Sequence, residues 1–166
     1  MSKAFTREDD AAEPARPAPV SLLPPGVKNY LTPEGRDRLQ AELTRLRGER
    51  PVLVEGSLAD VELRSELATL DQRIQYLERS LGSAEVVPPP GPGNDRVRFG
   101  STVTVRDSRG EEATYRLVGV DETDPARNEI SWRSPLAAAL LNARRGQRVP
   151  FRIPSGPTEL EVVRIE

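Results

Sequence analysis

The 166-residue chain contains neither cysteine nor histidine. Without cysteine it has no disulfide bond, no thiolate metal ligand and no cysteine nucleophile. Without histidine it lacks the commonest general base and zinc ligand of proteins. Any chemistry must therefore use carboxylates, hydroxyls, lysine or arginine, or else take place in the active site of a partner.

Long apolar segments and a strong net charge are also missing. No apolar run approaches the ~20 residues that span a bilayer, and the first ten residues, MSKAFTREDD, lack the apolar stretch of a signal peptide. We therefore expect a cytoplasmic protein with no membrane partner. The net charge is −2, so no global basic field favours nonspecific binding to nucleic acid.

Proline-rich stretches divide the chain into four parts. Residues 1–27 carry charges, alanine and prolines, which predicts a disordered tail. The stretch PPPGPG lies within 87–96, and this composition is typical of a linker. The remaining parts, 28–86 and 97–166, contain the regular hydrophobic patterns and are the expected folded domains.

The first pattern in residues 28–86 is that of a helix. Thr32 is a suitable N-cap, and Pro33 suits the first helical position, where its missing N–H costs nothing. Pro51 is expected to close or kink this helix, because its ring disfavours the helical conformation at the preceding residue. The apolar face of the helix consists of Leu39, Leu43 and Leu46.

A second helix is predicted from an apolar seam with spacing 4, 3, 4, 3, 4, which is typical of a coiled coil. Gly82 follows as the expected C-cap. The connection between the helices is short, so they should fold back as an antiparallel helical hairpin. The seam consists of Leu63, Leu67, Leu70, Ile74, Leu77 and Leu81.

Residues 97–166 show the alternating, β-branched pattern of strands, with one short helix opening at Pro135. Together with the hairpin, this predicts an α+β protein in which an antiparallel β domain follows the helices. The strands are expected at 97–105, 112–120, 128–132, 148–153 and 158–165.

Several stretches in this order resemble the Gre family of bacterial transcription factors, GreA and GreB. They are YLTPEGRDRLQAELTRL, LDQRIQYLERSLGSAEVV, RFGSTVTV, YRLVGVDE, ISWRSPLAAALL and TELEVVRIE, and the leader MSKAFTRE is similar to GreB-type members. The resemblance implies an FKBP-like C-terminal domain that binds RNA polymerase and a hairpin that enters the secondary channel. Acids at the hairpin tip then help hold the second Mg²⁺ of the polymerase while backtracked RNA is hydrolysed.

The resemblance also sets the partners. The protein would be an accessory factor and not itself an enzyme, with no cofactor of its own. Its partners would be RNA polymerase and, at the tip, the 3′ end of the nascent RNA, and we expect a monomer.

At the tip the chain departs from the family pattern. When the family motif is set on Gly56, its first acid falls on Ser57 and its second on Asp60; Glu62 is the other candidate for metal contact. The hairpin also looks about a dozen residues shorter than usual, which removes roughly 9 Å of reach. An alternative is purely structural: Ser57 and Asp60 form a capping box, and Arg64 pairs with Asp60.

The segment that would contact the rim of the polymerase channel corresponds to Arg133, Ser134, Pro135 and Leu136. Arg133 stands where the family often has Asp or Asn, which changes the charge of this contact. The structural alternative is that Pro135 starts a helix and that Leu136 and Leu140 belong to the core. Trp132 would belong either to this contact or to the core.

Three functions follow from these observations. The favoured one is a Gre-like regulator of elongation whose stimulation of transcript cleavage is weak or lost. The alternative is a competent cleavage factor that helps hold the second Mg²⁺. The third, a peptidyl-prolyl isomerase, is disfavoured because residues 97–166 offer few aromatic side chains for a proline pocket: Phe99, Tyr115, Trp132 and Phe151.

Overall fold

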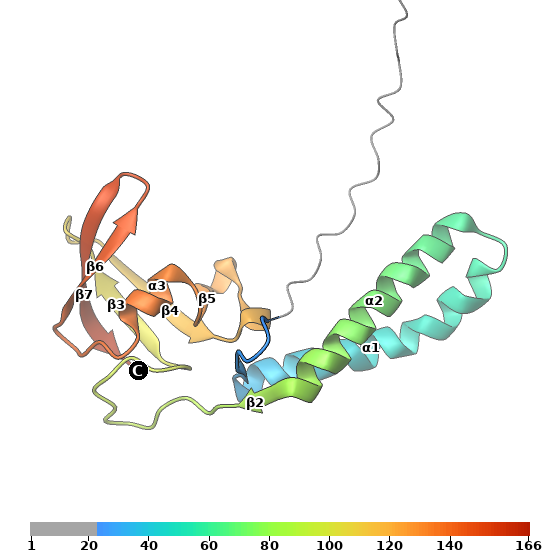
Figure 1. Ribbon diagram of the computed structural model, residues 1–166, viewed down its shortest axis with the longest axis horizontal. Helices are drawn as coiled ribbons and strands as arrows, with labels where there is room; N and C mark the ends of the chain where they lie inside the picture. Colours follow the sequence, from blue (N-terminus) through green and yellow to red (C-terminus); the bar gives the residue numbers. More distant parts are fainter. Residues whose placement is uncertain (1–22) are drawn as a thin grey trace, which may run out of the picture.

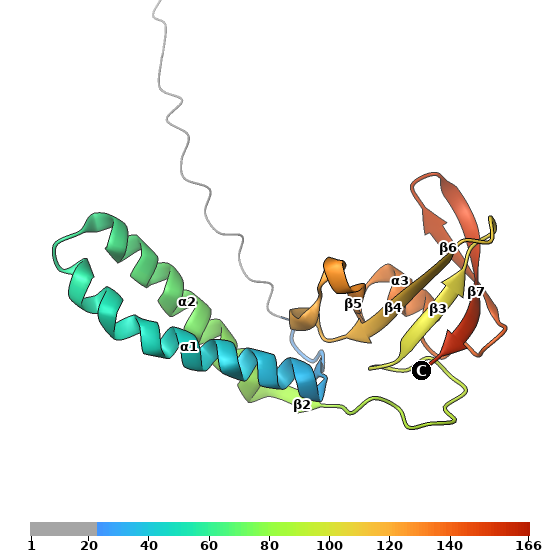
Figure 2. The ribbon, with the colours of Figure 1, turned by 180° about the vertical axis from the view of Figure 1, so that it is seen from behind.

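The computed structural model describes residues 23–166 and shows two parts, a long helical hairpin and a curled β-sheet domain (Figure 1). The view from behind shows the same division, with the hairpin extending away from the sheet (Figure 2). The protein is therefore of the α+β class, as predicted. Within the described residues, no helix combines the length and apolarity needed to cross a bilayer.

The disordered tail expected over residues 1–27 falls mostly outside the described part of the chain. Residues 1–22 lie outside the described part of the chain, but residues 24–27 form a turn in which Val27 N–H donates to the Pro24 carbonyl at 3.1 Å. Gly26 takes a φ of +83° at the third position, as a type II turn requires. The sequence Pro24-Pro25-Gly26 therefore forms the turn, with the fixed φ of Pro25 at its second position.

Helix α1 (Pro33–Ser57) begins at the predicted cap, where Thr32 Oγ1 accepts a hydrogen bond from Gly35 N–H at 3.0 Å. The prediction that Pro51 ends the helix is wrong, because α1 continues through Pro51 to Ser57. A proline inside a helix costs about 3 kcal/mol. Packing of α1 against its partner on both sides, at Leu46 and Leu53, offsets this cost.

Helix α2 (Val61–Ser83) runs back along α1, and the two apolar seams meet as predicted. The helix does not end at Gly82, contrary to expectation. It continues to Ser83, and the cap residue Ala84 is extended with ψ 136° because the chain passes directly into a strand. The buried contacts of the hairpin come from Leu39, Leu43, Leu46, Leu70, Ile74 and Leu77.

Two short strands at the base of the hairpin were not foreseen. Strand β1 (Asn29–Leu31) precedes α1, and β2 (Ala84–Val86) follows α2; they pair in parallel. Leu31 is fully buried between them and the helices. Three-residue strands are too short to show an alternating pattern, so the sequence gives no signal for them.

The second part is a five-stranded sheet in the order β5-β4-β3-β7-β6, with helix α3 (Pro135–Leu140) against one face. Each predicted strand has a counterpart, but the first begins at Thr102 and not at residue 97, because residues 99 and 100 form a turn. Strands β4 and β5 are parallel, not antiparallel. Two short 3-10 helices, η1 (Val120–Glu122) and η2 (Pro125–Arg127), carry the chain across before β5 starts. The strands are β3 (Thr102–Arg106), β4 (Glu112–Val118), β5 (Glu129–Ser131), β6 (Arg148–Ile153) and β7 (Gly156–Ile165).

A buried glutamate fastens the hairpin to the β domain. Glu122 is 4% exposed, and its Oε2 accepts hydrogen bonds from the backbone N–H groups of Thr32 at 2.9 Å and Gly119 at 2.8 Å. The Thr32 hydroxyl donates to the other carboxyl oxygen. Since the same hydroxyl caps α1, the start of the helix and its attachment to the β domain share one side chain.

Close approach at this junction requires glycine. A Cβ on Gly35 would lie 1.7 Å from Glu122 Oε1, and one on Gly119 would lie 2.3 Å from the Tyr30 carbonyl oxygen. Tyr30 also packs between Phe99 and Trp132, with ring centroids at 5.6 and 5.2 Å. Trp132 therefore belongs to the contact between the two parts of the molecule.

The two helices are also joined by a bidentate ion pair, which predicts a dependence of stability on pH. Arg73 donates to both carboxylate oxygens of Glu42, at 2.8 and 2.9 Å, and these hydrogen bonds lower the pKa of Glu42. Because the pKa of Glu42 is lower in the folded state than in the unfolded state, the ion pair stabilises the protein at pH values above the unfolded-state pKa of about 4.3. This stabilisation is lost as the pH falls through the folded-state pKa. Both side chains are about one-third exposed, so the contribution is small, about 0.5 kcal/mol.

We therefore expect Glu42→Gln to lower the thermal midpoint at pH 7 and to match the wild type at pH 3. Thermal unfolding followed by circular dichroism between pH 3 and 7 measures this difference. Glu66→Gln, an exposed change on α2, serves as the control and should shift neither end of the range. A difference that persists at pH 3 would mean that Glu42 acts through packing.

Candidate functional site

The hairpin tip is a turn of three residues, Leu58–Asp60. Asp60 is the N-cap of α2, and its Oδ1 accepts hydrogen bonds from Glu62 N–H at 2.7 Å and Leu63 N–H at 3.4 Å. Asp60 thereby satisfies backbone donors at the positive end of the helix dipole. One of its two oxygens is thus already engaged.

The predicted capping box between Ser57 and Asp60 is wrong, because Ser57 is the last residue of α1 and its hydroxyl donates to the Val54 carbonyl at 2.9 Å. The predicted ion pair is also absent, because Arg64 Nε donates to the backbone carbonyl of Asp60 at 3.4 Å. The two errors have one source: the N-cap of α2 is Asp60 and not Ser57, three residues earlier.

Gly56 has a packing role inside α1. A Cβ at this position would lie 2.7 Å from Leu63 Cδ1. Glycine therefore lets the last turn of α1 lie close against the first turn of α2. Gly56 is the last residue but one of α1, where a glycine costs only about 1 kcal/mol.

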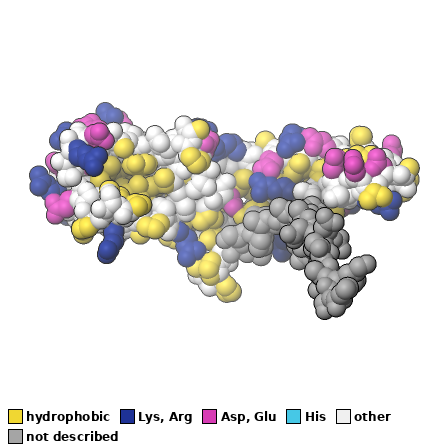
Figure 3. Space-filling model, turned by 90° about the horizontal axis from the view of Figure 1, so that it is seen from above, with side chains coloured by type: hydrophobic (Ala, Val, Ile, Leu, Met, Phe, Trp, Pro, Cys, Tyr) yellow, Lys and Arg dark blue, Asp and Glu magenta, His cyan; other side chains and the backbone are white. Residues whose placement is uncertain are grey.

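The surface of the tip combines exposed apolar side chains with acids. Leu58 is 84% exposed and Val61 is 71% exposed. Glu62 is also exposed, and none of the acids between residues 55 and 66 forms an ion pair with another described residue. Figure 3 shows acidic and hydrophobic side chains together at this end of the molecule. The two apolar residues were not singled out from the sequence, where they read as ordinary helix positions.

The acids of the tip are too dispersed to form a metal site by themselves. Among residues 23–166, no group of three or more acidic side chains lies close enough to hold a metal ion. Asp60 and Glu62 are two positions apart along the chain, and Asp60 is turned toward the start of α2. Any metal contact at the tip would therefore need further ligands from a partner.

The segment predicted to contact polymerase lies at the start of α3. Ser134 is the N-cap and accepts a hydrogen bond from Ala137 N–H at 3.2 Å, and Pro135 occupies the first turn. Leu140 is fully buried in the core, and Leu136 packs partly buried against it. Arg133 is exposed and has no acidic partner among the described residues, so its charge is directed to solvent.

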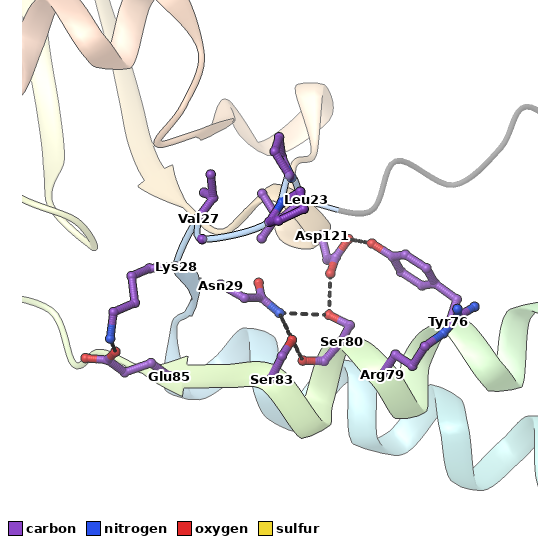
Figure 4. A pocket seen from close by; sticks show the side chains of 13 residues that line it. Leu23, Val27, Lys28, Asn29, Tyr76, Arg79, Ser80, Ser83, Glu85 and Asp121 are labelled. Atoms are coloured by element: carbon purple, nitrogen blue, oxygen red, sulfur yellow. Dashed lines mark hydrogen bonds and ion pairs between the residues drawn. The ribbon is translucent and has the colours of Figure 1, made fainter.

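A cavity of about 420 Å³ lies at the junction, where residues 23–29 pass over α2 (Figure 4). Most of the polar side chains that line the cavity form hydrogen bonds with one another. Ser80 Oγ donates to Asp121 at 2.5 Å, and the Tyr76 hydroxyl donates to the same carboxylate. Burial, and then this hydrogen bond, raise the pKa of Tyr76. Asn29 Nδ2 donates to the Ser80 carbonyl at 2.9 Å. The cavity wall therefore connects β1, α2 and η1.

Comparison with known proteins assigns the family. Residues 92–166 match the family described as "Transcription elongation factor, GreA/GreB, C-term". Transcription elongation factor GreB of Neisseria meningitidis serogroup A is 39% identical over 154 residues, covering 84% of this chain and 94% of its own. The chain belongs to the GreA/GreB family. GreA of Syntrophobacter fumaroxidans is 38% identical over 149 residues, covering 81% and 96% of the two chains.

A solved structure of the same family is also similar. GreA factor homolog 1 of Thermus thermophilus is 26% identical and covers 84% of this chain and 99% of its own, with a TM-score of 0.40. The alignment with the Neisseria GreB is 154 positions long, whereas the 84% of this chain that it covers is about 139 residues. Some residues of that GreB are therefore aligned with gaps in this chain.

Proposed function

We propose that this GreA/GreB-family protein binds RNA polymerase, enters the secondary channel with its hairpin and modulates elongation without efficient stimulation of transcript cleavage. Support for the family role comes from the relatives, which are named transcription elongation factors. Support for the altered activity comes from the tip. The segment Arg133–Leu136 is the proposed contact with the channel rim.

One observation carries the proposal: Asp60 is the N-cap of α2. Its Oδ1 is held by two backbone N–H groups, so only Oδ2 is free for a metal. The position of the family's first acid is Ser57, which lies buried in the last turn of α1. One half-engaged carboxylate with Glu62 beside it is a weak donor set.

The polymerase Mg²⁺ fits this tip poorly. Magnesium binds protein oxygens at 2.0–2.1 Å in a near-octahedral shell, so a ligand must be placed closely. The helices of the hairpin have 25 and 23 residues. A hairpin about a dozen residues shorter than is usual in the family, as the resemblance implies, would hold its tip several ångströms away from the metal. The exposed Leu58 and Val61 instead suit contact with apolar walls of a channel.

A transcript-cleavage assay on backtracked elongation complexes tests the proposal. We expect the protein to bind polymerase and to raise the cleavage rate by less than about tenfold, which corresponds to at most ~1.4 kcal/mol of barrier. Asp60→Asn and Glu62→Gln should change the rate less than about twofold. Asp60→Asn is preferred to alanine because asparagine keeps the N-cap while removing the charge. Strong cleavage that both substitutions abolish would instead establish a competent cleavage factor.

Binding is measured separately, so that loss of docking is not mistaken for loss of chemistry. Arg133→Glu should strengthen binding to polymerase about tenfold if α3 faces the channel rim, because it restores an acidic side chain where the family often has Asp or Asn. Arg109→Glu, at another exposed arginine in the β3–β4 turn, is the matched control and should bind as the wild type does. Equal effects of the two substitutions would remove the α3 segment from the proposed interface.

A further inference from the structure

A second concave surface lies on the β domain, away from the hairpin. The face of the sheet beside α3 forms a groove of about 280 Å³. Alternate residues of a strand share a face, and α3 is only six residues long, so it leaves one end of this face uncovered. Ile153 is 39% exposed there. The apolar lining consists of Val105, Ala113, Tyr115, Leu136, Phe151, Ile153 and Leu160.

The rim of this groove is acidic. Asp107, Glu111 and Glu112 line it, and none of the lining residues is basic. Glu112 pairs with Arg106 at 2.7 Å, whereas Glu111 is exposed and makes no ion pair within residues 23–166. An occupant with an aromatic group between positive charges would match both the apolar lining and the acidic rim.

We propose that residues 1–7 of the same chain, MSKAFTR, bind in this groove. Phe5 is the only aromatic residue among residues 1–22, and Lys3 and Arg7 lie two positions to either side. In an extended segment, residues two apart point to the same face. Phe5 would then enter the apolar groove while both cations face the acids of the rim.

The chain is long enough for this contact. Residues 8–22 span up to roughly 50 Å when extended. A domain of about 70 residues has a radius of gyration near 11 Å, so its diameter is roughly 28 Å. The described chain begins at Leu23, which lines the junction cavity together with Asp121 of the β domain. Every point on the β domain is therefore within reach.

Photo-crosslinking of the free full-length protein tests this inference without involving polymerase. Phe5→p-benzoylphenylalanine places a reactive group at the proposed contact. We expect crosslinks within the chain to peptides that contain Tyr115, Leu136 or Phe151, identified by mass spectrometry. Glu111→Lys should lower their yield about threefold, the effect of one exposed ion pair. Adding Lys3→Glu and Arg7→Glu to Glu111→Lys should restore the yield, and Glu66→Lys should leave it unchanged.

Mixing isotopically labelled and unlabelled protein separates contacts within a chain from contacts between chains. Crosslinks found only between chains would show that a second copy fills the groove and would overturn the proposal. Crosslinks that fall on the hairpin, or that ignore Glu111→Lys, would overturn it as well. Because Glu111 is an exposed turn residue, its substitution does not put the fold at risk.

Discussion

Replacing Glu122 with alanine is expected to lower the free energy of unfolding by about 3–5 kcal/mol. The carboxyl accepts hydrogen bonds from the backbone N–H groups of Thr32 and Gly119 and from the Thr32 hydroxyl, all in a site that water does not reach. A buried donor left without a partner costs about 1–3 kcal/mol. The cavity left by the side chain adds to this loss.

The substitution should also free the hairpin. Arg38 lies 3.4 Å from Glu129, so this ion pair between α1 and the β domain remains after the change, whereas the contacts of Glu122 with the backbone do not. Urea denaturation measures the stability, and small-angle scattering measures whether the molecule samples more extended shapes. Glu159→Ala, an exposed acid on β7, is the control and should stay within about 0.5 kcal/mol of the wild type.

A double-mutant cycle isolates the contact itself. Thr32→Val removes the hydroxyl, and its combination with Glu122→Ala should cost less than the sum of the single changes, because both disrupt one network. Additive losses would show that the cap of α1 and the attachment to the β domain are independent. An unfolding midpoint of Glu122→Ala equal to that of the wild type would rule out this carboxyl as the fastening.

The elements that the sequence predicted well are those with local signals. Thr32 and Pro33 mark the start of α1, and the leucine spacing marks the face along which the helices meet. The strands of the β domain follow their β-branched alternation. Pro51 and Gly82 misled because local propensity is a weak force beside the packing of two long helices.

The junction was invisible for a different reason. Thr32 and Glu122 are 90 residues apart, and neither residue type signals burial on its own. Gly35 and Gly119 read as ordinary glycines until the distances to Glu122 and Tyr30 are known. At the tip, the sequence identifies Asp60 as a functional candidate. Its role as an N-cap was not predicted, because it depends on α2 beginning at Val61 and not about one turn earlier, directly after Ser57.

Leu77→Ala is expected to cost about 3–5 kcal/mol, while Leu63→Ala should cost less than about 1.5 kcal/mol. Both residues belong to the same seam, but Leu77 is fully buried at the base, near Leu31, whereas Leu63 is only partly buried near the tip. Leu58→Ala, the same substitution at a side chain that is 84% exposed, is the matched control and should cost almost nothing. Urea denaturation followed by circular dichroism gives the three values.

This gradient has a consequence for the proposed role of the tip. If stability is concentrated at the base, backbone amides between Val54 and Leu67 should exchange with solvent faster than those around Leu77, as measured by hydrogen exchange. Equal losses for Leu63→Ala and Leu77→Ala, with uniform exchange, would mean that the hairpin is rigid to its end. A firmly attached base with a looser end suits a tip that adapts its apolar side chains to a channel wall better than one that must place a carboxylate within a few tenths of an ångström of a metal ion.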